Sequence, residues 1–124
     1  MIGYTTVGTN DLPRATAFYD AVLGLLGAHR TMTFDRGYAW GVSMDKPGFG
    51  LLTPFNGQPA TVGNGTMIAL ACDTPERVQA VYSKALELGG TDEGAPGQRG
   101  GPFYAAYFRD LDGNKLNAFC MLKG

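Results

Sequence analysis

The stretch Tyr4-Thr-Thr-Val-Gly-Thr-Asn-Asp-Leu12 decides the fold, because it joins a strand to the start of a helix. Its first half is rich in β-branched residues, which favour extended backbone. Asn10 and Asp11 can cap a helix, and Pro13 suits a first helical turn because its missing N–H would have no partner there. We therefore expect a strand over residues 2–9 and a helix over residues 13–26.

The same pattern returns later in the chain. A shift of 63 residues carries Tyr4 onto Met67, Val7 onto Leu70, Phe18 onto Val81, Tyr19 onto Tyr82, Leu23 onto Leu86, and Gly27 onto Gly90. The second copy predicts a strand over residues 66–72, a capping pair before Pro75, and a helix over residues 75–88. Such an internal repeat indicates two tandem copies of one structural unit.

Strand-like runs follow each helix. In the first half they cover residues 29–34, 38–44 and 50–54, and in the second half residues 103–109 and 115–121. Residues 91–101 are rich in glycine and polar residues, so they form either a short broken strand or an ordered loop. The sequence thus predicts one α+β domain of two tandem βαβββ modules, at about residues 1–58 and 63–124. Each module has one helix, which covers one face of its strands. The uncovered faces of the two modules then form the inside of a cupped mixed sheet.

Strand alternation predicts which side chains enter the cup. Successive residues of a strand point to opposite faces, and the more aliphatic side belongs under the helix. This places Tyr4, Met67 and Asn117 inside the cup. The repeat aligns Leu52 with Asn117, so we expect Tyr4, Leu52, Met67 and Asn117 to come together.

Composition excludes several classes of function. The chain has 124 residues and a net charge of −1, and its basic residues are scattered singly. Nucleic-acid binding needs clustered Lys and Arg, and a membrane span needs about 20 apolar residues, so neither partner is expected. There is no signal-peptide pattern, and two cysteines do not make a disulfide framework. A cytoplasmic protein is the natural interpretation.

Three motifs together resemble the vicinal oxygen chelate superfamily, which holds glyoxalase I, bleomycin resistance proteins and extradiol dioxygenases. They are the opening Tyr4–Leu12 stretch, Ala17-Phe-Tyr-Asp-Ala-Val-Leu23, and Phe108-Arg-Asp-Leu-Asp-Gly-Asn-Lys-Leu-Asn117. The resemblance covers essentially the whole chain. It implies paired βαβββ modules, which agrees with the repeat, and it implies a homodimer, since members of this family usually pair.

The resemblance also identifies where a metal would bind. Metal-dependent members carry His, Glu or similar ligands on the first and last strands of each module, and the matching positions here are Tyr4, Leu52, Met67 and Asn117. Divalent ions need carboxylate, imidazole or thiolate ligands in most positions. We therefore expect no metal and no other cofactor.

The histidine, the Asp110–Asn114 motif and the two cysteines could carry chemistry, but a structural role is expected for each. His29 is the single histidine and begins a strand, so a surface position is expected. The Asp110–Asn114 motif loosely resembles a calcium loop, but it lacks the distal ligands and favours a tight turn. Cys72 and Cys120 are both expected under a helix as inert packing, without a basic neighbour to activate them.

Aromatic residues and one arginine complete the candidate site. Several aromatic side chains fall on predicted strands, and some of them must line the cup because both faces of a sheet cannot be core. Arg99 lies in a glycine-rich segment at the expected rim, either as a surface residue or as an anion clamp. The predicted ligand-binding pocket is made of Tyr4, Trp40, Leu52, Met67, Arg99, Tyr107 and Asn117.

Three functions remain open at this stage. The favoured one is a metal-free protein that binds or sequesters a small organic molecule, because the family's metal positions hold poor ligands. The alternative is a glyoxalase-like lyase or isomerase with a non-standard or metal-free site, in which the catalytic residues are unknown. The third is a homodimeric module without an active pocket.

Overall fold

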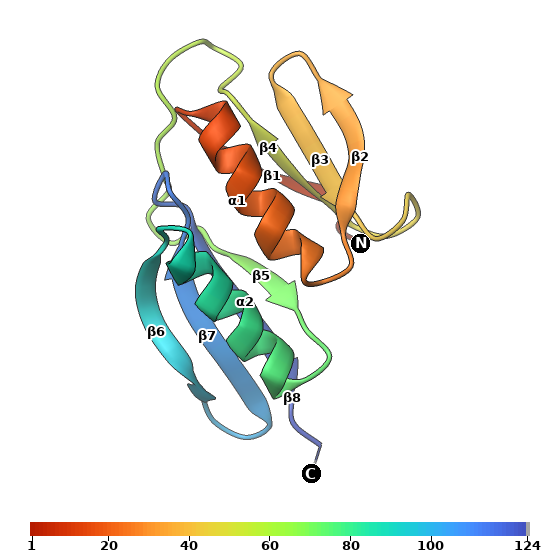
Figure 1. Ribbon diagram of the computed structural model, residues 1–124, viewed down its shortest axis with the longest axis vertical. Coiled ribbons are helices and arrows are strands. Elements are labelled where there is room, and N and C mark those ends of the chain that lie inside the picture. The colour runs from red at the N-terminus through yellow and green to blue at the C-terminus, as the bar shows by residue number, and fades with distance from the viewer. Residues whose placement is uncertain (124) are drawn as a thin grey trace.

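The computed structural model describes residues 1–123 and contains two copies of one βαβββ unit (Figure 1). The first module contains β1 (Tyr4–Gly8), α1 (Leu12–Gly24), β2 (His29–Phe34), β3 (Gly37–Gly41) and β4 (Gly48–Leu52). The second module contains β5 (Ile68–Ala71), α2 (Pro75–Glu87), β6 (Thr91–Gln98), β7 (Phe103–Arg109) and β8 (Lys115–Met121). The predicted α+β class and tandem repeat are confirmed.

Each module forms its own four-stranded mixed sheet. The strand orders are β1-β4-β3-β2 and β5-β8-β7-β6. In each sheet the first strand of the module lies at one edge and pairs in parallel with the last strand, and the remaining pairs are antiparallel. Figure 1 shows α1 and α2 on the same side of the molecule, each covering one sheet. The opposite face of each sheet carries no helix.

The helices start where the capping residues predict. The Asp11 side chain accepts a hydrogen bond from the Arg14 N–H, and Thr74 does the same for Arg77. Proline follows each cap, where its fixed φ suits the first turn. The helix α1 ends two residues earlier than predicted, because Leu25 and Leu26 already form the turn that leads to Gly27 at a φ of 79°.

Residues 91–101, which the sequence left as either a broken strand or an ordered loop, contain the strand β6 with irregular pairing. β6 pairs with β7, but its register shifts between Asp92 and Gly94 and again between Gly94 and Gly97. Such shifts are typical of glycine-containing bulges, which let a strand bend without losing its neighbour. The broken strand is therefore the alternative that the structure supports.

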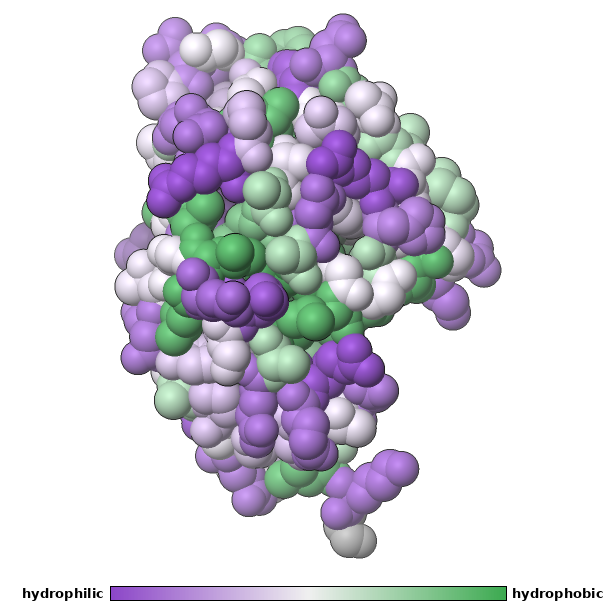
Figure 2. All heavy atoms as spheres, viewed as in Figure 1, coloured by the Kyte–Doolittle hydropathy of each residue, from purple (hydrophilic) through white to green (hydrophobic). Residues whose placement is uncertain are grey.

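One hydrophobic core runs through both modules. Phe18 of α1 and Trp40 of β3 belong to the same cluster as Val81 of α2 and Phe108 of β7. Figure 2 shows hydrophobic side chains gathered across the middle of the helical face, where the two helices lie side by side. No helix among residues 1–123 is long and apolar enough to cross a membrane.

A buried hydrogen-bond network also joins the modules. The hydroxyl of Tyr19, on α1, donates to Asp110 Oδ2 at 2.5 Å, and Asp110 lies in the turn between β7 and β8. Asp110 Oδ1 accepts the backbone N–H groups of Asp112 and Asn114, both at 2.9 Å. The Asn114 amide then donates to Asp110 Oδ2 and to the Gly8 carbonyl, both at 2.9 Å. Each oxygen of the buried carboxyl group is thus satisfied.

The same turn holds the entry to α1. The backbone N–H of Asn10 donates to Asp112 Oδ1 at 2.9 Å, and the Asn10 side chain bonds both polar backbone groups of Ala60. The Asp110–Asn114 motif is therefore a tight turn, as predicted. Its side chains also connect β1, α1 and the segment between the two modules.

We predict that Tyr19→Phe lowers stability by about 1–3 kcal/mol near neutral pH, because the buried Asp110 Oδ2 loses one of its two donors. Burial, together with the neighbouring Asp110, raises the pKa of Tyr19 well above its ordinary 10.0. The unfolded chain therefore ionises this phenol first, so wild-type stability falls as the pH rises above about 10. Urea unfolding between neutral pH and pH of about 11 measures both effects.

Tyr4→Phe is the matched control, since Tyr4 is 74% exposed and its hydroxyl has no hydrogen-bond partner among residues 1–123. The free energy of unfolding should fall less steeply at alkaline pH in Tyr19→Phe than in the wild type, whereas Tyr4→Phe should follow the wild type. Equal alkaline profiles for all three proteins would contradict the role given to the Tyr19–Asp110 bond.

Candidate functional site

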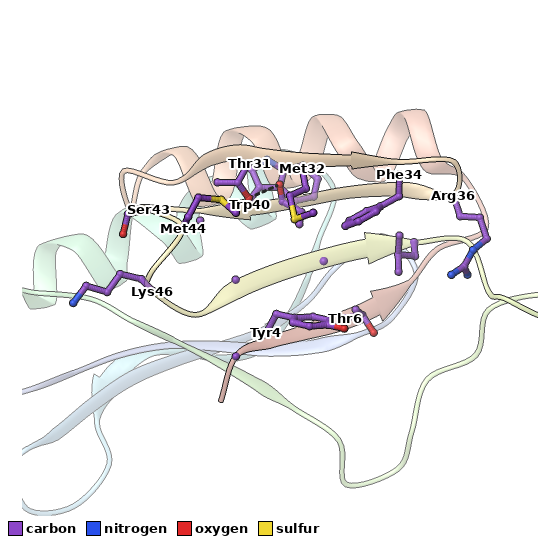
Figure 3. A pocket seen from close by; sticks show the side chains of 16 residues that line it. Tyr4, Thr6, Thr31, Met32, Phe34, Arg36, Trp40, Ser43, Met44 and Lys46 are labelled. Carbon is purple, nitrogen blue, oxygen red and sulfur yellow. Dashed lines mark hydrogen bonds between the residues drawn. The ribbon is translucent and has the colours of Figure 1, made fainter. Parts of the chain in front are cut away.

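A cavity of about 480 Å³ lies on the open face of the first sheet (Figure 3). Its floor is made by Ala39, Gly41, Gly48 and Gly50 from the two middle strands. Its walls are large side chains from the two edge strands and from the end of β4, and its rim carries two basic residues. These groups are Tyr4, Met32, Phe34 and Leu52 for the walls, and Arg36 and Lys46 for the rim.

The glycines of the floor are not all required by packing. A Cβ at Gly48 would meet only the Trp40 carbonyl oxygen at 3.4 Å and Tyr4 Cβ at 3.6 Å, which are ordinary contacts. By contrast, a Cβ at Gly50 would lie 3.0 Å from Thr6 Cγ2. Glycine weakens a strand interior, and it often marks a place where a ligand approaches the backbone. The bare floor at Gly48 fits that use.

The walls of the cavity are apolar and unusually exposed. Tyr4 is 74% exposed, Met32 46% and Phe34 43%, although all three have large hydrophobic side chains. Figure 3 shows these side chains turned toward the same space, Tyr4 from one edge strand of the sheet and Met32 and Phe34 from the other. Large exposed apolar groups that gather on one face are typical of a binding site.

The charge around the cavity is positive. Arg36 Nη1 donates to the Thr53 carbonyl at 2.7 Å, which fixes the guanidinium near the rim, and Lys46 lies at the opposite side in Figure 3. No Asp or Glu lines this cavity within residues 1–123. The arrangement therefore favours a neutral or anionic ligand over a cation.

The structure corrects the predicted orientation of Trp40. Trp40 borders the cavity, but its indole is 1% exposed and donates to Asp20 on α1 at 2.9 Å. Asp20 also accepts two bonds from Arg30, which hold the pKa of its carboxyl below the ordinary value. On β3, Tyr38 and Trp40 share the helix side, so Ala39 and Gly41 face the cavity.

The structure also separates residues that were expected to meet. Tyr4 and Leu52 line the cavity of the first sheet, but Met67, Arg99, Tyr107 and Asn117 do not. Asn117 pairs with Tyr107 in the second sheet, and Met67 precedes β5 with 42% of its surface exposed. Two open sheet faces therefore exist, and the described cavity belongs to the first alone.

Several site residues were missed in the sequence. Met32 and Phe34 stand two residues apart on β2, a strand whose bounds were predicted correctly, so alternation could have placed them on one face. The glycines of the floor were not among the predicted site residues. Position within a strand, and not glycine content alone, was the signal that could have revealed them.

The thiols and the histidine show no sign of activation. Burial raises the pKa of the Cys72 thiol to about 11, which leaves it protonated near neutral pH. Cys120 is buried, its pKa is also raised by burial, and both cysteines are free. His29 lies exposed at the start of β2.

The donor set does not fit a divalent metal. No three His, Cys, Asp or Glu side chains gather in a way that could hold an ion among the residues described. Of the four residues that the resemblance matched to metal positions, Tyr4 and Leu52 line the cavity, and Met67 and Asn117 do not. These residues supply neither the ligand types nor the convergence that metal chemistry needs.

The fold and the site define a protein of paired βαβββ modules with an apolar cavity on an open sheet face. A family description of the Glyoxalase/Bleomycin resistance protein/Dioxygenase superfamily matches residues 1–118. The chain therefore belongs to this superfamily, as the sequence motifs indicated. No match was found among curated proteins.

Solved structures agree with this assignment. A glyoxalase/bleomycin resistance protein from Albidiferax ferrireducens is 41% identical, with a TM-score of 0.87 over 97% of this chain and 98% of that chain. A lactoylglutathione lyase from Agrobacterium tumefaciens is 20% identical, with a TM-score of 0.70 over 97% and 92% of the two chains. A fosfomycin resistance protein from Listeria monocytogenes is 16% identical, with a TM-score of 0.70 over 97% and 92%. The latter two show a shared fold alone.

We predict that the purified protein retains no stoichiometric divalent metal, because its donor set is poor. Elemental analysis after dialysis against nickel, zinc, manganese and ferrous iron tests this expectation. One tightly held ion per chain, ligated by His29 or by carboxylates, would contradict it.

Proposed function

We propose that this protein binds or sequesters a small, largely apolar organic molecule in the cavity of the first sheet, without a metal. The observation that carries the proposal is the glycine floor between apolar walls. A ligand ring can lie directly on the strand backbone there, because no side chain projects from Gly41 or Gly48.

The size and lining of the cavity support this proposal. Small-molecule sites usually measure about 300–1,000 Å³ and are mostly apolar with a few polar groups, and this cavity lies within that range. Met32 and Met44 supply flexible apolar area that adapts to different shapes. The positive rim at Arg36 and Lys46 would suit a ligand with an anionic or carbonyl group at its edge.

Family membership supports the same class of function. The 41% identical relative carries a glyoxalase/bleomycin resistance name, and another neighbour is a fosfomycin resistance protein. Both resistance names refer to small organic molecules. Without a fitting metal site, binding is the part of the family's chemistry that these residues support best.

We predict that Gly48→Ala weakens ligand binding without harming the fold. A thermal-shift screen of small organic compounds on the wild type supplies the ligands. A methyl group on the floor should reduce the affinity of each hit roughly tenfold, as one misplaced methylene does in a tight pocket. The same substitution should keep or slightly raise stability, because alanine is less flexible than glycine.

Gly24→Ala is the matched control, since Gly24 ends α1 and an added Cβ there would meet no atom within 4 Å. It should bind every hit as the wild type does. A screen without hits would count against the proposal. So would hits whose affinity is the same in wild type and in Gly48→Ala.

We further propose that the protein is a homodimer in solution. Met44 at the cavity is 74% exposed and Phe55 outside it is 89% exposed, and exposed apolar area of this kind usually marks an interface. Light scattering at micromolar concentration should give about twice the chain mass of 13.1 kDa. A mass near 13.1 kDa at every concentration would refute the dimer.

A further inference from the structure

The two cysteines of the chain stand opposite each other on paired strands. The backbone N–H of Cys72 donates to the Phe119 carbonyl at 2.8 Å, which continues the parallel pairing of β5 with β8 by one residue. Ala71 is the partner of Phe119 in this register, so Cys72 is the partner of Cys120. Neighbouring strands lie about 4.7–4.9 Å apart. That spacing is within the range of about 4.4–6.8 Å that separates the Cα atoms of a disulfide.

Both thiols also lie on the helix-covered side of the sheet. Cys120 is 3% exposed and belongs to the hydrophobic core, and the half-buried Cys72 packs against the same core. Strand alternation agrees, because each cysteine follows a core residue by two positions, Leu70 on β5 and Ala118 on β8. Two thiols on one face of adjacent strands are placed to form a disulfide.

A cavity of about 370 Å³ gives access to one of the two thiols. Its lining consists of residues 25–27, in the turn after α1, and of residues 71–73 and Arg77 on the other side. In Figure 1 the end of β5 lies close to the end of α1, and the Arg77 guanidinium donates to the Leu25 carbonyl across this gap. Cys72 lines the cavity and Cys120 does not. A small molecule therefore meets Cys72 first.

The surroundings of Cys72 set how fast it can react. Burial raises the pKa of its thiol to about 11, and the neighbouring Cys120 adds to this rise. The rate of thiol–disulfide exchange depends on the fraction of thiolate, which is small at neutral pH for such a group. The pair therefore reacts slowly, and prolonged exposure to an oxidant is needed to convert it.

We propose that Cys72 and Cys120 form a reversible disulfide site, in which Cys72 reacts with a low-molecular-weight disulfide in the cavity and Cys120 then displaces the bound half. The site lies away from the glycine-floored cavity of the first sheet. It therefore stands or falls independently of the function proposed for that cavity.

The exchange is balanced in two steps. The Cys72 thiolate attacks one sulfur of the small disulfide, whose S–S bond breaks, and the released half takes up a proton as a free thiol. The Cys120 thiolate then attacks the Cys72 sulfur of the mixed disulfide and releases the second half as a thiol. The protein is oxidised by two electrons and loses two hydrogen atoms, and the small disulfide is reduced to two thiols.

Intact mass spectrometry with a neutral probe, bis(2-hydroxyethyl) disulfide, tests the site on the whole chain. After incubation for hours in excess probe, the time that uncatalysed exchange requires, the wild type should lose the mass of two hydrogen atoms. Digestion without a reductant should yield one cross-linked pair of peptides, which contain Cys72 and Cys120. A dithiol reductant should restore the original mass.

Single variants separate the two roles. Cys120→Ala should stop at the mixed disulfide and gain the mass of one half of the probe, because nothing displaces it. Cys72→Ala should react roughly tenfold more slowly or less than the wild type, since susceptibility follows exposure and Cys120 is 3% exposed. Each variant thus serves as the matched control for the other.

A measurement on the wild type replaces the variants if either fails to fold. One equivalent of N-ethylmaleimide should alkylate Cys72 before Cys120, because only Cys72 lines the cavity. The protein alkylated at Cys72 should then keep its mass in the presence of the probe.

Four outcomes would overturn the proposal. They are a wild type that stays unmodified after prolonged incubation, a wild type that ends with a separate mixed disulfide on each cysteine, a disulfide that joins two copies of the chain, and a Cys72→Ala variant that reacts as fast as the wild type.

Discussion

The bond from Tyr19 to Asp110 is the constraint on which the relation of the two modules depends. Repeats of this size cannot bury both faces of their sheets alone, so each module packs its helix side into a common core. The Asp110–Asn114 turn then fixes how the halves meet, because it reaches α1 through Tyr19 and β1 through the Gly8 carbonyl. A buried carboxyl group with every donor in place allows little sliding between the halves, since any shift would leave a polar group unpaired. The positions of the two open sheet faces follow from this turn.

The helix-covered faces of both sheets pack into one core. The open faces, by contrast, differ in chemistry although the modules share a fold. The first face has a floor of glycine and alanine, so its large wall residues enclose an apolar space. The second face carries long or aromatic side chains at the matching strands, and these cover one another. Repeat symmetry therefore describes the backbone well and the surfaces poorly, because side chains exposed on an open face are free of the packing that keeps the core similar.

The fold could be predicted from the sequence because its signals are local. The caps before Pro13 and Pro75, the helical spacing of apolar residues and the turn at Asp110 each act within a few residues. The site could be predicted only in part. Tyr4 and Leu52 were placed on the correct face, since strand alternation fixes facing once a core side is known. The orientation of Trp40 depended on the register of β3, and the joint pocket depended on how two modules meet, which no local pattern encodes.

Asn117 shows that the open face of the second sheet includes a buried position with an energetic cost. A central strand position that points away from the helix is nearly dry, so a ligand residue there must find a partner or lose stability. The Oδ1 of Asn117 has no hydrogen-bond partner among residues 1–123, although burial of an unpaired acceptor is costly. The neighbouring Ala118 points to the helix side and is equally buried, but it brings no polar group into the core. The free energy lost at Asn117 must therefore be offset by the rest of the fold, above all by the core that both modules share.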